Sequence, residues 1–114
     1  MADLSDNFNR SEFACKCGCG QDTVDAQLLD ILQDVRNEFG PVNITSANRC
    51  PSHNKAEGGS EKSQHLRGRA ADIQVTGIPP SQIAIYVDDK WPQIGLGAYN
   101  TFTHIDTRGH KARW

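Results

Sequence analysis

The chain has 114 residues, with 12 Lys and Arg against 14 Asp and Glu, which gives a formal net charge of −2. This length suits one domain over residues 1–114 and is too short for two. The near-neutral charge argues against general nucleic-acid binding, and no apolar run approaches the ~20 residues of a membrane span. The acidic start, Met1 to Asp6, lacks the basic-then-apolar order of a signal peptide, so we expect synthesis in the cytoplasm.

The first predicted elements are a polar lead-in and a long helix. Residues 1–12 are polar, and Phe8 and Phe13 are the expected anchors to the core. Helix signals start near Asp22 or Thr23, and Gly40-Pro41 stops the helix. Between these limits, apolar side chains recur at helical spacing at Leu28, Leu29, Ile31, Leu32, Val35 and Phe39.

Short strands and a second helix follow. Residues 42–45 predict a strand, residues 51–59 a brief helical turn, and the polar residues 59–69 a loop. Residues 70–75 alternate like a half-buried strand, and Pro79-Pro80 introduces a helix over roughly residues 81–89. Two further strands are predicted over residues 94–99 and 102–107, joined through Asn100-Thr101. This order of elements is typical of an α+β domain.

Strand parity indicates which polar side chains can meet. In the strand before the second helix, Asp72 points away from the apolar face, and in the last strand His104 and Asp106 share one face. If these two strands pair, Asp72 and His104 lie above the same face of the sheet. His65 can reach that point because Gly68 lets the preceding loop turn tightly.

Two imidazoles and a carboxylate, from His65, His104 and Asp72, form a three-ligand set for zinc. Three protein ligands leave a fourth position for water, which distinguishes catalytic from structural zinc. Zinc polarises carbonyl groups and lowers the pKa of water toward neutrality, so the expected chemistry is hydrolysis. Each residue alone would be interpreted as a polar surface group, but with Gly68 and Ala70 in register they indicate a metal site.

The run from Ser63 to Asp72 resembles the motif Ser-x-His-x-x-Gly-x-Ala-x-Asp of the zinc D-alanyl-D-alanine carboxypeptidase family, which also includes phage endolysin peptidases. The later run from Phe102 to Asp106 fits the strand of the family's last ligand, and residues 46–49 match its Arg-containing strand end. The resemblance covers nearly the whole chain. It implies a small α+β domain of the hedgehog/DD-peptidase type, with an antiparallel sheet and helices packed on one side.

The resemblance also implies roles for particular residues. His65, Asp72 and His104 would be the zinc ligands. Arg49 would hold the scissile carbonyl oxygen or a substrate carboxylate, and Ser63 would hydrogen-bond substrate near the metal. The implied substrates are peptidoglycan stem peptides, with D-amino acids around the cut bond.

The general base departs from the family pattern. Many members carry Glu or Asp three residues before the last ligand, where this chain has Thr101. Asp106 is our candidate for the general base in its place, because it shares a strand face with His104. Alternatively, Asp106 orients the imidazole of a ligand histidine. Glu57 and Glu61, near the motif loop, are weaker candidates.

The state of the four cysteines stays open. Cys15, Cys17, Cys19 and Cys50 suit a second, structural zinc ion, although the one-residue gaps are shorter than the usual two to four. Disulfides are a second interpretation, which a reducing cytosol opposes. Buried or partly buried free thiols are the third.

The remaining histidines and the tryptophans have simpler interpretations. We expect His53 and His110 to be solvated. Trp91 and Trp114 are expected to be packing residues, although Trp114 also suits the lining of a cleft. We therefore assign no chemistry to these four side chains.

The ligand set predicts zinc-dependent hydrolysis. The resemblance implies a zinc metallopeptidase, a carboxypeptidase or endopeptidase, that cuts peptidoglycan peptides in an endolysin or cell-wall remodelling role. The alternatives are a non-catalytic zinc-binding module, as in hedgehog-type signalling domains of similar fold, and a phage virion or tail component. We expect a monomer that binds peptidoglycan peptides but no nucleic acid and does not insert into membranes. It would reach the cell wall after holin release or as part of a phage particle.

Overall fold

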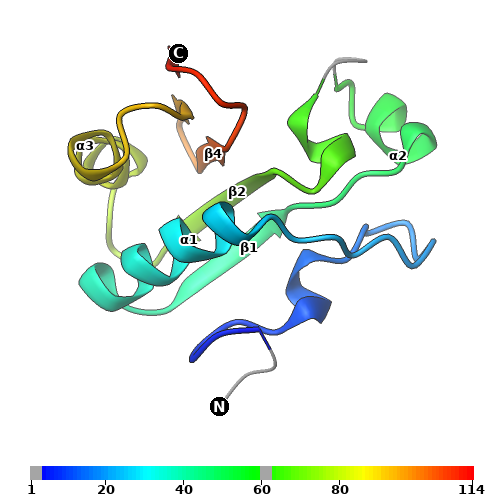
Figure 1. The fold of residues 1–114 in the computed structure, drawn as a ribbon, viewed down its shortest axis with the longest axis horizontal. Coiled ribbons are helices and arrows are strands. Elements are labelled where there is room, and N and C mark those ends of the chain that lie inside the picture. Colours follow the sequence, from blue (N-terminus) through cyan, green and yellow to red (C-terminus); the bar gives the residue numbers. More distant parts are fainter. Residues whose placement is uncertain (1–3, 60–62) are drawn as a thin grey trace.

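The computed structural model of the chain describes residues 4–59 and 63–114, and Figure 1 shows how its elements are arranged. Three α-helices, two short 3-10 helices (η) and five strands follow one another within these residues. In chain order they are η1 (Arg10–Phe13), α1 (Ala26–Phe39), β1 (Val42–Ser46), α2 (Pro51–Ala56), η2 (Gln64–Arg67), β2 (Ala70–Val75), α3 (Pro80–Lys90), β3 (Gly95–Ala98), β4 (Thr103–Asp106) and β5 (Ala112–Arg113).

The strands form one sheet in the order β1-β2-β4-β3-β5. The pairs β1–β2, β2–β4 and β3–β4 are antiparallel, whereas β5 runs parallel to β3. The predicted α+β class and the mostly antiparallel sheet are confirmed. The two-residue strand β5 was not predicted, because a segment this short carries no alternation pattern.

The core lies between the sheet and the helices α1 and α3. α1 crosses in front of β1 and β2 in Figure 1, and buried side chains of both helices join those of the strands in one cluster. Full burial of each large apolar side chain contributes about 1.5–3 kcal/mol. Phe8 and Phe13 belong to this cluster, each only 1% exposed, which confirms their predicted role as anchors.

The first helix begins later than the sequence predicts. α1 starts at Ala26 rather than near Asp22 or Thr23, because the Asp25 side chain accepts a hydrogen bond from the backbone N–H of Leu28 at 3.2 Å. Asp25 is therefore the N-cap. Its backbone N–H also donates to the carbonyl of Gly68 at 3.0 Å, so a contact distant in sequence fixes where the helix begins.

The described part of the predicted loop over residues 59–69 contains the 3-10 helix η2. Ser63 is its N-cap, and the Ser63 hydroxyl accepts from the backbone N–H of His65 at 3.2 Å. Gly68 ends η2 in the left-handed conformation, with φ of 67°. A Cβ on Gly68 would lie 2.7 Å from the carbonyl oxygen of Thr23, so only glycine fits this turn.

The register of β2 and β4 directs two polar side chains to one face of the sheet. Asp72 pairs directly with His104, and the neighbouring pair joins Ala71 with Ile105. Because side chains alternate along a strand, Ile105 points into the core while His104 points to the opposite face. The predicted meeting of Asp72 and His104 is confirmed.

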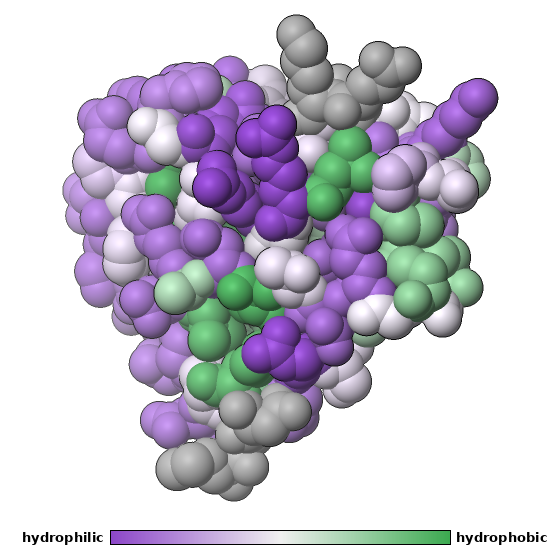
Figure 2. Space-filling view, turned by 45° about the vertical axis from the view of Figure 1, so that its right-hand side comes forward, coloured by the Kyte–Doolittle hydropathy of each residue, from purple (hydrophilic) through white to green (hydrophobic). Residues whose placement is uncertain are grey.

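Within the described residues, no helix is both long and apolar enough to cross a bilayer. On the face that Figure 2 shows, hydrophilic side chains dominate and hydrophobic ones form small, separate patches.

Candidate metal centre

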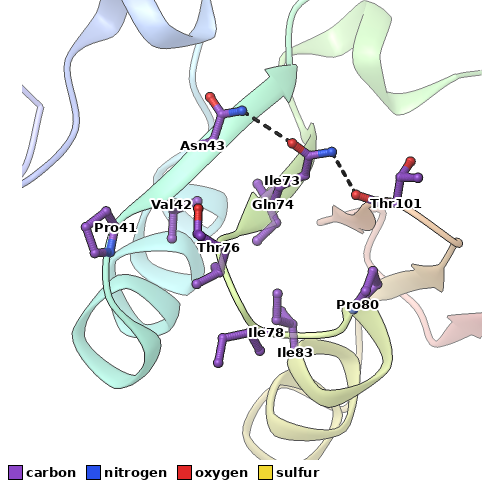
Figure 3. Close-up of a pocket in the computed structure, with 11 residues that line it drawn as sticks. Pro41, Val42, Asn43, Ile73, Gln74, Thr76, Ile78, Pro80, Ile83 and Thr101 are labelled. Atoms are coloured by element: carbon purple, nitrogen blue, oxygen red, sulfur yellow. Dashed lines mark hydrogen bonds between the residues drawn. The ribbon is translucent and has the colours of Figure 1, made fainter.

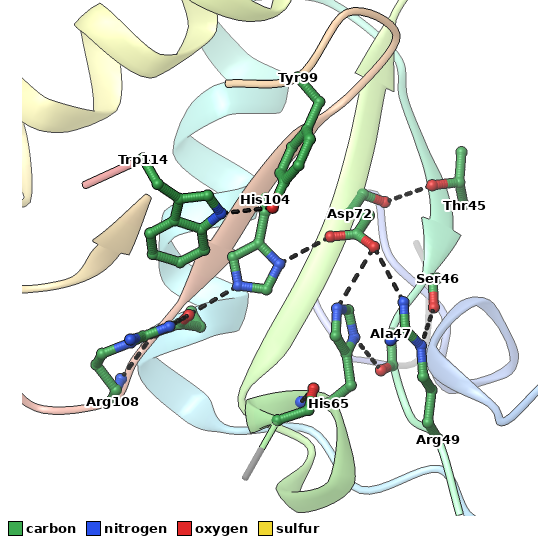
Figure 4. Close-up of polar contacts among 12 residues, drawn as sticks. Thr45, Ser46, Ala47, Arg49, His65, Asp72, Tyr99, His104, Arg108 and Trp114 are labelled. Atoms are coloured by element: carbon green, nitrogen blue, oxygen red, sulfur yellow. Dashed lines mark hydrogen bonds and ion pairs between the residues drawn. The ribbon is translucent and has the colours of Figure 1, made fainter. Parts of the chain in front are cut away.

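His65 reaches the sheet from η2 and is held by a backbone carbonyl. Its side chain is 4% exposed, and Nδ1 lies 2.7 Å from the carbonyl oxygen of Ala47. A carbonyl can only accept, so Nδ1 carries a proton, and in the neutral ring the lone pair is on Nε2. Nε2 faces Asp72, 3.4 Å from Oδ2 (Figure 4). A backbone bond of this kind fixes the tautomer and the ring orientation of a metal-ligating histidine.

Asp72 lies at the centre of the group. Its Oδ1 is 2.8 Å from His104 Nδ1, and its Oδ2 is 3.4 Å from both His65 Nε2 and Arg49 Nη2. Burial raises the pKa of the Asp72 carboxyl, but its interactions with the His104 and His65 rings outweigh burial and lower that pKa to about 2. Asp72 is therefore a carboxylate, the form that binds a metal ion.

His104 is bounded by a carboxylate on each side of its ring. Nδ1 faces Asp72, and Nε2 lies 2.7 Å from Asp106 Oδ2. Burial lowers the pKa of His104, but hydrogen bonds that the ring donates to the Asp106 and Asp72 carboxylates outweigh burial, so the pKa is raised. When Nε2 donates to Asp106, Nδ1 is the nitrogen that can offer a lone pair toward His65 and Asp72.

Asp106 is completely buried and is held by more than His104. Arg108 donates to Asp106 Oδ1 from Nε at 2.8 Å and from its backbone N–H at 3.2 Å, and to Oδ2 from Nη2 at 2.7 Å. Burial raises the pKa of Asp106, but the bonds from Arg108 and His104 hold it well below the usual carboxyl range. Asp106 therefore remains charged and fixes the ring of His104.

One ligand atom each from His65, Asp72 and His104 can be chosen so that all lie within 4.8 Å of one another. Two imidazole nitrogens and one carboxylate oxygen are donors that zinc binds, and both rings have their second nitrogen occupied by a protein oxygen. The residues present therefore fit a zinc ion.

Arg49 lies beside this group, where the sequence predicted a functional arginine. Its Nε donates to Ser46 Oγ at 3.1 Å, and its backbone N–H donates to the carbonyl of His65 at 3.1 Å. Together with the contact to Asp72, these bonds hold the guanidinium at the edge of the metal group (Figure 4). Its side chain is 14% exposed, so an anion in the cavity can still reach it.

The metal group opens into a cavity of about 640 Å³. Ser63 and Arg49, to which the resemblance assigns substrate contacts, line it, and so does Glu57, whose side chain is 55% exposed. Asp106 is not among the lining residues. The predicted weaker candidate Glu61 lies outside the described residues.

Aromatic side chains form one wall of this cavity. Tyr99 and Phe102 stack with ring centroids 4.5 Å apart, and the ring of Trp114 lies 5.2 Å from that of His104. The Trp114 indole N–H donates to the Tyr99 hydroxyl. Of the two interpretations of Trp114, lining a cleft is the one that the structure bears out.

Sequence reasoning missed Arg108, which lines the cavity, binds Asp106 and lies over the Trp114 ring at 4.9 Å. Arg108 lies two positions beyond Asp106, the last residue of β4, so strand alternation gave no firm signal for it. Tyr99 and Phe102 were missed because they flank a hairpin turn, where alternation does not indicate direction.

A second cavity, of about 420 Å³, lies at the other end of β2 (Figure 3). None of the described residues that line it is ionisable, so it offers no acid or base. Thr101 belongs to this second cavity and not to the one with the metal group, and its carbonyl accepts from Gln74 at 2.8 Å.

The other residues considered from the sequence have ordinary surroundings. His110 is exposed, as expected, whereas His53 is partly buried rather than solvated, with Nε2 3.6 Å from Glu57 Oε1. Trp91 packs against the core and donates from Nε1 to Asp34 at 3.4 Å, as expected of a packing residue. The four cysteines form a second group, separate from His65, Asp72 and His104.

Comparison with known proteins agrees with this geometry. The family described as Peptidase M15 matches the chain over residues 6–106, which include all three members of the metal group. A search of curated proteins finds no match. The family match covers most of the chain, and the fold brings two histidines and a carboxylate together in a group that could hold a metal ion. The chain therefore belongs to the peptidase M15 family of zinc metallopeptidases.

Proposed function

We propose that this protein hydrolyses peptide bonds in peptidoglycan stem peptides, in an endolysin or cell-wall remodelling role. The observation that carries the proposal is the group of His65, Asp72 and His104 on the floor of an open cavity, with Arg49 at its edge. The family match supports zinc-dependent peptidase chemistry, and the substrate class is our inference from the cavity.

His65 through Nε2, His104 through Nδ1 and Asp72 through its carboxylate would hold one zinc ion. A bound zinc ion supplies Lewis-acid polarisation of the scissile carbonyl and lowers the pKa of water toward neutrality. Ala47 and Asp106 keep the two imidazole rings in the tautomers that this binding needs.

Arg49 would bind the oxygen of the scissile carbonyl as negative charge develops, or a carboxylate of the substrate. Its position beside Asp72 supports either role, because a guanidinium presents several donors in one plane. Ser63, at the start of η2, lines the cavity and would hydrogen-bond the peptide backbone.

For Asp106 we favour the orienting role over that of general base. A base works best with a pKa near the operating pH, whereas the pKa of Asp106 is held far below it by Arg108. Asp106 is also fully buried and does not line the cavity. Glu57 lines the cavity with its carboxylate open to solvent, and we propose it as the proton acceptor.

The cavity suits a peptide that carries extra carboxylates. Stem peptides contain D-glutamate, diaminopimelate or a terminal D-alanine, each with a free carboxylate near the cut bond. Arg49 and Arg108 both line the cavity, and the aromatic wall of Tyr99, Phe102 and Trp114 offers an apolar surface to the rest of the peptide. These features support peptidoglycan peptides as the substrate class.

The test is to incubate purified protein with peptidoglycan and with defined muropeptides, and to identify the products by mass spectrometry. We expect cleavage that a chelator abolishes and added zinc restores, with His104→Ala inactive and the exposed His110→Ala as active as the wild type. The product masses would name the bond. No cleavage by zinc-loaded protein would instead support a non-catalytic zinc module. Stable co-purification with phage tails, without cleavage, would support a virion component.

A further inference from the structure

The four cysteines of the chain converge on one point although they come from distant segments. Cys15, Cys17 and Cys19 lie on the loop between η1 and α1, and Cys50 directly precedes α2. All four Sγ atoms lie within 4.8 Å of one another. Cys17 is 3.4 Å from both Cys15 and Cys50, Sγ to Sγ.

These distances match a tetrahedral tetrathiolate site. With zinc–sulfur bonds of about 2.3 Å, the sulfur atoms of a tetrahedral site lie ~3.8 Å apart. A disulfide brings two sulfur atoms to about 2.0 Å and separates the four residues into two pairs. Here each sulfur is near all three others, which is the arrangement that one shared ion requires.

The loop is shaped to direct three thiols inward. The one-residue gaps that weaken the sequence signal are spanned by a turn at residues 16–17 and a bend at residues 18–19, which bring Cys15, Cys17 and Cys19 together. Gly18 has φ of 83° and donates to the carbonyl of Cys15 at 3.1 Å, which turns the chain between Cys17 and Cys19. The loop is closed by the Cys15 N–H, which donates to the carbonyl of Gln21 at 2.7 Å.

The fourth ligand is positioned by independent contacts. The backbone N–H of Cys50 donates to Cys15 Sγ at 3.4 Å. The Asn48 side chain, 1% exposed, donates to the carbonyls of Phe13 at 2.7 Å and Thr23 at 2.6 Å. The segment with Cys50 is therefore fixed to both ends of the loop that carries the other three thiols.

We propose that Cys15, Cys17, Cys19 and Cys50 bind a structural zinc ion that fastens the loop over residues 14–22 to the segment between β1 and α2. That segment also carries Arg49, whose carbonyl accepts from Gln21 at 3.4 Å. The ion thus connects the N-terminal loop to the edge of the metal centre. All four zinc positions are filled by protein sulfur, so this ion takes no part in hydrolysis.

The experiment measures metal content and cobalt spectra of the full chain, purified under reducing conditions. We expect two zinc ions per wild-type chain and one in Cys17→Ser, while Lys16→Ala, an exposed change in the same loop, keeps two. After replacement of zinc by cobalt, the wild type should show thiolate-to-metal charge-transfer absorption. His104→Ala should lose one ion but keep this absorption, which separates the cysteine site from the proposed peptidase site.

A thiol-labelling measurement on the wild type keeps the proposal testable even if Cys17→Ser does not fold. We expect all four thiols to resist labelling in the zinc-loaded protein and to react once a chelator is added. Thiols that react equally with and without zinc would overturn the proposal. So would disulfides in the intact mass, absence of the cobalt–thiolate absorption, or an unchanged zinc content in folded Cys17→Ser.

Discussion

Replacement of Asp106 by Asn separates the two roles that this residue can have. The substitution keeps the shape of the side chain but leaves one acceptor oxygen where the carboxylate has two. In the wild type, Asp106 Oδ2 accepts hydrogen bonds from His104 and from the guanidinium of Arg108. Its Oδ1 accepts from the same guanidinium and from the backbone N–H of Arg108. An amide cannot accept all of these bonds, so the His104 ring loses its fixed orientation.

The expected size of the effect follows from the role of such a partner. Removal of a carboxylate that orients a ligand imidazole weakens metal binding by about 10–100-fold, which corresponds to about 1.4–2.7 kcal/mol. We expect the upper half of this range, because Asp106 is completely buried and water cannot replace it.

The assay titrates zinc against a competing chelator and follows the imidazole signals of His104 by NMR, so that only this site is observed. Circular dichroism confirms that the variant is folded. Asp88→Asn is the matched control, since Asp88 also pairs with an arginine, Arg113, but on the surface and away from the metal centre. Its zinc affinity should equal that of the wild type.

An Asp106→Asn variant that folds, binds zinc as tightly as the wild type and has lost catalysis would refute this reasoning. That combination is the expected behaviour of a general base. Loss of zinc affinity with residual cleavage after zinc saturation would agree with the orienting role.

Three further predictions concern other parts of the molecule. Glu57→Gln should lower kcat for a muropeptide by about 100-fold or more while zinc content is unchanged, and an unchanged kcat would exclude Glu57 as the base. One of the two zinc ions should be released as the pH falls through the histidine range, because protons compete with zinc for histidine ligands. Retention of two zinc ions per chain down to about pH 5, measured by dialysis and metal analysis, would contradict histidine ligation. Asp34→Asn should lower the free energy of unfolding by about 1 kcal/mol in denaturant titrations, because Asp34 accepts bonds from α3 and Trp91. The pKa of Asp34 is lowered in the folded state, so the wild type should lose this stability as the pH falls below the ordinary carboxyl range. The control Asp30→Asn, at an exposed position, should change the free energy of unfolding little. An equal loss of stability in both variants would refute the assignment.

Alternation along strands accounts for the part of the centre that could be predicted. Asp72 and His104 lie on the face away from the core because Ile73 and Ile105 lie on the other, and antiparallel pairing then brings the two polar residues opposite each other. The sequence pattern carries this information directly. The glycine at position 68 likewise indicated the turn that brings His65 to them.

Contacts between distant segments account for what could not be predicted. The start of α1 depends on Asp25, whose side chain accepts from Thr107 at 2.8 Å and whose backbone bonds to Gly68, and neither partner is visible from local sequence. The approach of Cys50 to Cys17, 33 positions earlier, depends on the buried amide of Asn48. Propensity and spacing describe neighbours along the chain, and these contacts are not between neighbours.

The central claim is that one zinc ion is held by His65, Asp72 and His104. Anomalous diffraction at the zinc absorption edge, from crystals of zinc-loaded protein, tests it most directly. We predict a peak about 2.0–2.2 Å from His65 Nε2, His104 Nδ1 and an oxygen of Asp72. A zinc-loaded protein with no peak between these three residues, or with the ion bound through His104 Nε2, would contradict the account.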